Sequence, residues 1–80
     1  MNVKEFVRIY DGELENILKP RNAPTKQQLH VRLGYADAHI ETVEFMLAQG
    51  GYTSDEVAML EDQLNRYREW RRQTRREVYS

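Results

Sequence analysis

The segment from Thr25 to Gln49 constrains the fold most, because it reads as one helix that is apolar on two opposite sides. At 1.5 Å per residue, such a helix is about 37 Å long. An ordinary surface helix has one apolar stripe and one polar side, so a two-sided helix needs two packing partners. One face carries Leu29, Leu33, Ala36, Ile40, Val43 and Leu47, and the opposite face carries Val31, Tyr35, Ala38, Thr42, Phe45 and Met46.

A helix is predicted on each side of this segment. Residues 3–19 form the first, which Pro20 ends because proline cannot donate a backbone hydrogen bond. Gly12 in its middle is expected to mark a kink or a break. Residues 54–78 form the last helix, with Thr53 and Glu56 at the positions of a capping box. The apolar stripes are Val3, Phe6, Val7, Tyr10, Leu14, Ile17 and Leu18 in the first helix, and Val57, Leu60, Leu64, Tyr67, Thr74 and Val78 in the last.

These patterns predict an all-α fold of three helices in a single domain over residues 1–80. The second helix (residues 25–49) and the third (residues 54–78) are joined by only about four residues, so they should form a long antiparallel hairpin. The first helix then packs across this hairpin, or is exchanged between two copies in a dimer. Gly34, inside the second helix, is expected at a close helix crossing rather than at a ligand.

The chain is too short to be stabilised easily by its own core. A domain of this length buries only about 60% of its unfolded surface, and small domains usually add disulfides, metals or oligomerisation. The sequence has no cysteine, which excludes disulfides and thiolate metal sites. We therefore expect a homodimer or binding to a larger partner. The expected self-association surface is Val31, Tyr35, Phe45 and Met46; in the alternative, a monomer, the first helix covers these residues.

No catalytic or metal site is evident. His30 and His39 are nine residues apart and point to opposite sides of a helix, so they cannot share a metal ion. Asp37, Glu41 and Glu44 line one side of the second helix, where they hold a divalent ion, act as an acid–base pair, or pair with arginines of the third helix. We favour the last alternative and expect no catalytic activity, no cofactor and no metal.

Six arginines lie between residues 66 and 76 of the third helix. Residues 63–80 carry these arginines against two glutamates, a formal charge of +4; since the whole chain carries −1, the remainder carries −5. Arg71 and Arg75 lie close to the apolar stripe, so the helix end either leaves the bundle or meets an acidic group. The candidate partner-binding residues are Arg66, Arg68, Trp70, Arg71, Arg72, Arg75 and Arg76.

Three interpretations of this arginine cluster remain open. The arginines pair with the acidic side of the second helix, or they belong to a protein interface, where arginine and tryptophan are enriched. In the third interpretation they bind nucleic-acid phosphates while Trp70, Tyr67 or Tyr79 stacks on bases.

We therefore expect a non-catalytic helical module that binds another, larger protein, as an adaptor or an inhibitor of a macromolecular machine; the alternative is a nucleic-acid-binding protein. By analogy only, phage- or plasmid-type accessory proteins that inhibit host nucleases, CRISPR systems or transcription have this character. The apolar runs fall short of the roughly 20 residues that a membrane span needs, and no signal-peptide pattern is present. We expect no membrane association and a cytoplasmic location, in the host cytoplasm for a viral protein.

Overall fold

The computed structural model describes residues 2–18 and 24–79, and these form three α-helices with no strand among them. The helices are α1 (Val3–Leu18), α2 (Lys26–Gln49) and α3 (Ser54–Val78). The predicted all-α fold is thereby confirmed. Pro20, most of the predicted linker and the side chains of Ile17 and Leu18 lie outside the described part of the chain.

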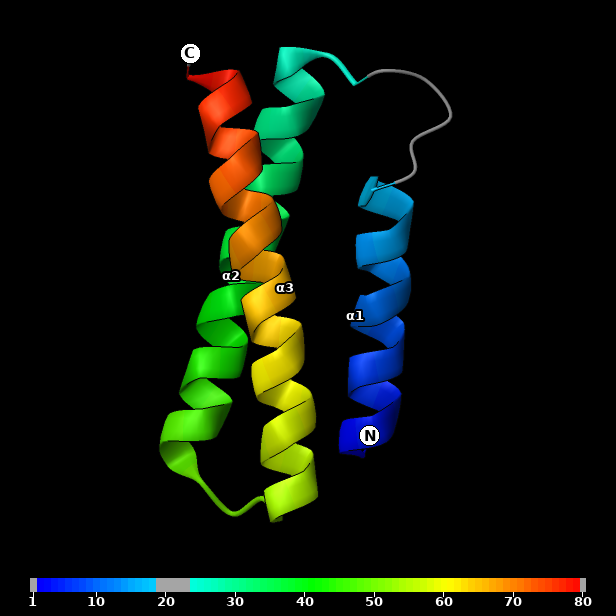
Figure 1. Ribbon diagram of the computed structural model, residues 1–80, viewed down its shortest axis with the longest axis vertical. Helices are drawn as coiled ribbons and strands as arrows, with labels where there is room; N and C mark the ends of the chain where they lie inside the picture. Colours follow the sequence, from blue (N-terminus) through cyan, green and yellow to red (C-terminus); the bar gives the residue numbers. More distant parts are fainter. Residues whose placement is uncertain (1, 19–23, 80) are drawn as a thin grey trace.

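Helices α2 and α3 form the predicted long antiparallel hairpin (Figure 1). Each begins with a complete capping box, in which the threonine hydroxyl accepts a hydrogen bond from the third backbone N–H of its helix. These bonds join Thr25 to the Gln28 N–H at 3.1 Å and Thr53 to the Glu56 N–H at 3.2 Å. Gly50 follows the end of α2 with a φ of 78°, a conformation that favours glycine. The sequence signals for helix ends therefore act locally as expected.

Helix α1 lies alongside α3 and runs in the same direction, rather than across the hairpin (Figure 1). It packs on the hairpin of its own chain, and it continues through Gly12 without the expected break. Val7 and Leu14, on either side of this glycine, are both buried. Their burial is worth roughly 1.5–3 kcal/mol each, which exceeds the cost of about 1 kcal/mol for one glycine in a helix.

The core lies where the three helices meet and takes only one face of α2. From α2 it includes Leu33, Ala36, Ile40 and Val43, as the first of the two predicted apolar faces requires. The expected close crossing at Gly34 is absent: this glycine is exposed, and an added Cβ would meet no atom within 4 Å. The other buried apolar residues are Val3, Val7, Leu14, Leu60, Leu64, Tyr67, Trp70 and Val78.

Within residues 2–18 and 24–79, no helix has a stretch long and apolar enough to cross a membrane.

Candidate protein-binding surface

The second apolar face of α2 is not covered by the other described residues of the chain. Tyr35 is 72% exposed, Phe45 64% and Val31 54%, and Ala38 and Thr42 lie exposed between them. The Thr42 hydroxyl donates to the Ala38 carbonyl oxygen at 2.8 Å, so its hydrogen is satisfied inside the helix. We call these five residues the α2 face. Exposed apolar patches of this kind mark interaction sites when they are contiguous.

Of the two alternatives for this face, coverage by the first helix is wrong, because α1 packs mainly against α3 and leaves Tyr35 and Phe45 in solvent. Met46, which was expected to share the self-association surface, is instead partly buried against the core. At about 80° from Ala38 around the helix, Met46 lies on the side that turns towards α1. Self-association through the remaining residues stays a prediction.

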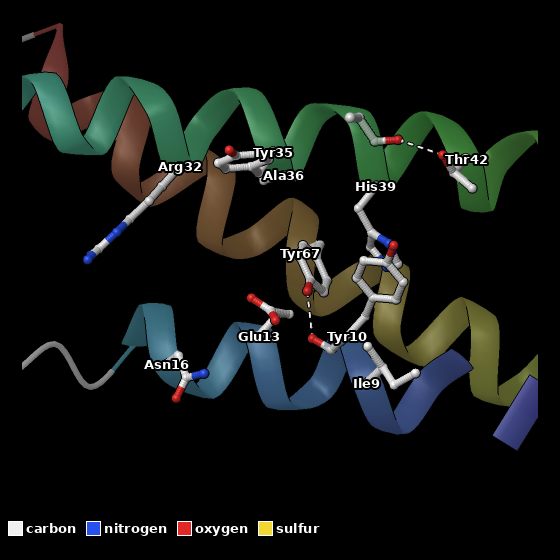
Figure 2. A pocket seen from close by; sticks show the side chains of 11 residues that line it. Ile9, Tyr10, Glu13, Asn16, Arg32, Tyr35, Ala36, His39, Thr42 and Tyr67 are labelled. Atoms are coloured by element: carbon white, nitrogen blue, oxygen red, sulfur yellow. Dashed lines mark hydrogen bonds between the residues drawn. The ribbon is translucent and has the colours of Figure 1, made fainter. Parts of the chain in front are cut away.

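A groove of about 580 Å³ runs between α1 and α2, directly beside the α2 face (Figure 2). Its volume falls in the range of about 300–1,000 Å³ that is typical of binding pockets. In Figure 2, Glu13 points from α1 into the groove, and Arg32 extends from α2 outward past its rim. The lining comprises Ile9, Tyr10, Glu13 and Asn16 of α1, Arg32, Tyr35, Ala36, Ala38, His39 and Thr42 of α2, and Tyr67 of α3. Since Tyr35, Ala38 and Thr42 belong to both, the groove and the α2 face form one surface.

The inner end of the groove is built around the buried imidazole of His39. Its ring centroid lies 4.0 Å from that of Tyr10 and 4.3 Å from that of Tyr67. The Tyr67 hydroxyl donates to the Tyr10 carbonyl oxygen at 2.6 Å and so ties α3 to α1 (Figure 2). Burial, with the nearby carboxylates of Glu13 and Asp11, raises the pKa of Tyr67, so the hydroxyl keeps its proton as a donor.

Gln63 of α3 completes this network, and its hydrogen bonds determine the tautomer of His39. Its amide nitrogen donates to the Val7 carbonyl oxygen at 2.7 Å and to the Asp11 carboxylate at 3.0 Å. Its amide oxygen must therefore accept the 2.9 Å hydrogen bond from His39 Nε2. His39 carries its hydrogen on Nε2, and its Nδ1 is buried without a hydrogen-bond partner among the described residues.

Protonation of His39 would place a second N–H at this buried position, so the neutral imidazole is favoured. Burial lowers the pKa of His39, while the hydrogen bond to Gln63 and the Asp11 carboxylate oppose this shift more weakly. The unfolded chain binds a proton at this histidine below a pH of about 6.5, and the folded chain does so only at lower pH.

We therefore expect the folded state to lose stability as the pH falls below about 6.5, with a slope from this residue of up to about 1.4 kcal/mol per pH unit. The loss should level off once the pH passes the lowered folded pKa. Urea denaturation between pH 7.5 and 5 measures the slope. In His39→Gln, which is less stable at every pH, this part of the slope should disappear; an equal slope in both proteins would contradict the assignment.

The acidic side of α2 is a partner for the arginines of α3. Asp37 accepts from Arg71 at 3.0 Å and from Arg75 at 3.4 Å, and Glu44 lies 3.6 Å from Arg68. The end of α3 therefore stays on the bundle, as the burial of Thr74 and Val78 also shows. The first of the three interpretations of the arginine cluster thus applies to Arg68, Arg71 and Arg75.

The other predicted partner-binding residues are distributed differently. Arg66 pairs with Asp11 of α1 at 2.8 Å and with Asp62 at 3.0 Å, and Arg72 pairs with Glu69, which lowers the pKa of that glutamate. Arg76 is exposed. Trp70 is only 8% exposed and belongs to the core, so it is not an accessible anchor.

Sequence reasoning missed His39 and Gln63 as a unit. One signal was present for Gln63, which lies three residues after Leu60 and four before Tyr67, on the line of the buried stripe. A polar side chain on such a line needs a buried partner. The partner comes from another helix, and the spacing along α3 contains no information about it.

No group of three histidine, aspartate or glutamate side chains that could hold a metal ion occurs in the described parts of the chain. In comparisons with known proteins, no family model, no curated protein sequence and no solved structure matches this chain.

Proposed function

We propose that this protein is a non-catalytic module that binds another, larger protein through the α2 face and the adjoining groove. The observation that carries the proposal is the exposure of Tyr35, Phe45 and Val31 on one side of a helix whose opposite side forms the core. Burial of such a side chain is worth roughly 1.5–3 kcal/mol. A partner that covers this face therefore gains a hydrophobic stabilisation that the folding of this chain alone does not provide.

A small helical bundle that presents such a face suits an adaptor or an inhibitor of a larger assembly. The ion pairs of Arg68, Arg71 and Arg75 with acidic residues of α2 favour a structural role for these arginines over nucleic-acid binding. A phosphate backbone would have to compete with carboxylates that are already in place. Exposed pairs of this kind contribute about 0–1 kcal/mol each.

The test removes the aromatic side chains of the α2 face. Wild-type protein, Tyr35→Ala, Phe45→Ala and Tyr79→Ala are immobilised, and the proteins captured from an extract of the native cell are quantified. Tyr79 is a matched control, because it is 70% exposed but lies after the end of α3. We expect at least a tenfold loss of the captured partner for the two face variants and no loss for Tyr79→Ala.

The free energy of unfolding is measured for each variant as a control. For all three variants it should lie within about 0.5 kcal/mol of the wild-type value, as is usual for substitutions at exposed positions. Capture that is unchanged in both face variants, or lost only in Tyr79→Ala, would contradict the proposal.

A further inference from the structure

We infer that the occupant of the α2 face is a single amphipathic helix of a different protein, with basic residues flanking its apolar stripe. This inference rests on the proposed function and specifies the chemistry of the partner. It uses three properties of the surface: the period of its apolar residues, the groove at its side, and the carboxylates that border it.

The period of the α2 face fits another helix. Its residues follow one another at intervals of four, three, four and three, from Val31 to Phe45. This spacing averages 3.5 residues, the repeat at which two helices keep a continuous line of contact. Gly34 and Ala38, one turn apart on the exposed side of α2, leave room for a close approach at the middle of the line.

The groove offers space for a side chain on one side of a helix that docks on the α2 face. Ala36, which is fully buried by its own chain, lies at the inner wall together with Tyr67. Ile9 of α1 and Tyr35 of α2 are exposed at the two rims. A large apolar side chain from a helix that lies along the α2 face would enter this space, in the way that anchor residues of helical peptides enter the grooves of their receptors.

Three charged side chains border the surface without an ion pair among the described residues: Glu13, Glu41 and Arg32. Arg32 extends away from Glu13 at the end of the groove (Figure 2), so each carboxylate remains available to a cation of the occupant. Glu13 points into the groove from α1 (Figure 2). Glu41, which is three residues after Ala38 and four before Phe45, lies on the opposite flank of the α2 face. By contrast, Asp37 is already held by Arg71 and Arg75. Lysine or arginine on both flanks of a docked helix would complement Glu13 and Glu41.

A second copy of this chain fits the same surface less well. A twofold pair of antiparallel α2 helices centred on Ala38 would place Val31 opposite Phe45 of the other copy. The flank of one α2 would then face the same flank of the other, with Glu41 close to the other copy's Asp37. The cations nearest to Glu41 would then be Arg71 and Arg75 of the other copy, which are already bound to Asp37, whereas basic flanks of a foreign helix would offer unpaired cations to Glu41.

The test uses two synthetic helical peptides of about 20 residues, with one leucine stripe in common and either lysine or glutamate at every flanking position. Each peptide is titrated into the ¹⁵N-labelled full-length protein, and both the affinity and the map of shifted amide signals are recorded. We expect the lysine peptide to bind at least tenfold more tightly and to shift residues of the α2 face and groove. This preference should shrink when NaCl is raised from about 50 to about 500 mM.

Charge-reversal variants connect the preference to the two carboxylates. Glu13→Lys and Glu41→Lys should each lower the affinity of the protein for the lysine peptide about fivefold or more. Glu61→Lys, which makes the same change at an exposed site of α3, should leave its affinity within twofold of wild type. A loss of similar size in Glu61→Lys would mean that net charge alone attracts the peptide, and would overturn the inference.

The outcomes separate the inference from the proposed function. Equal affinity of both peptides at the α2 face would overturn the inference that the partner helix has basic flanks, and would not contradict the proposed function. Shifts confined to another surface, or no binding of either peptide, would overturn the inference, and unchanged capture by Tyr35→Ala and Phe45→Ala would be needed to overturn the proposed function as well. A solution mass of two chains that Phe45→Lys reduces to one would identify a second copy as the occupant and overturn the inference.

Discussion

Gln63→Leu is expected to destabilise the protein by about 2–5 kcal/mol. Gln63 is fully buried, and its amide serves both the Val7 carbonyl oxygen of α1 and the His39 imidazole of α2. Leucine has nearly the same shape but leaves the N–H of the His39 imidazole buried without a partner, which costs about 1–3 kcal/mol. It also removes the hydrogen bonds from Gln63 to the Val7 carbonyl oxygen and the Asp11 carboxylate, each worth about 0.5–1.5 kcal/mol, although both acceptors keep another partner within the helix or in Arg66. A domain of this length has a free energy of unfolding of roughly 4–12 kcal/mol, so a large part of its stability would be lost.

Urea denaturation followed by circular dichroism measures this effect as a lower midpoint at an unchanged slope. Gln73→Leu is the matched control, because Gln73 is exposed on the same helix and its side chain bonds, among the described residues, only to Glu69. The midpoint of this variant should stay near that of wild type. If Gln63→Leu were as stable as wild type, the hydrogen bonds that join α1 to the hairpin would not contribute to holding it there.

Trp70→Ala is expected to cost about 3–5 kcal/mol of stability, the usual range for a buried tryptophan. Trp70 is 8% exposed and belongs to the core, although the sequence placed it among partner-binding residues. The two assignments predict different results: an interface residue loses binding at unchanged stability, whereas a core residue loses stability.

Thermal unfolding of Trp70→Ala, Trp70→Phe and Tyr79→Ala decides between these assignments. The phenylalanine variant should recover part of the loss because it refills part of the volume. Tyr79→Ala removes an aromatic side chain that is 70% exposed and should unfold close to wild type. An unfolding temperature for Trp70→Ala equal to that of Tyr79→Ala would show that the indole is not part of the core.

The sequence predicts the helices and the hairpin well because these depend on local signals. Apolar period, threonine caps and the glycine at the end of α2 act within a few residues of one another. Whether α1 continues through Gly12 depends instead on its packing against the other helices. Gly12 has a local cost that predicts a break, and the burial of Val7 and Leu14 against the rest of the molecule outweighs it.

The candidate site is harder to predict, because a period shows which residues share a face and not which neighbour covers it. The two apolar faces of α2 look equivalent in sequence, yet one is buried at Ile40 and Val43 while the other is exposed at Tyr35 and Phe45. For the same reason the contact between His39 and Gln63, residues on different helices, is invisible along either helix. The pairing of Asp37 with Arg71 was one of several alternatives that charge alone left open.

Site-specific photo-crosslinking shows whether the α2 face is the surface through which this protein binds other proteins. A photoactivatable phenylalanine analogue is placed at position 45 of the α2 face, or at position 61 on an exposed side of α3, and each protein is irradiated in an extract of the native cell. We expect a discrete crosslinked protein from position 45 that is absent from position 61 and is lost when Tyr35 is also replaced by alanine. The same crosslinked protein from position 61 alone, or with equal yield from both positions, would show that the α2 face is not the binding surface.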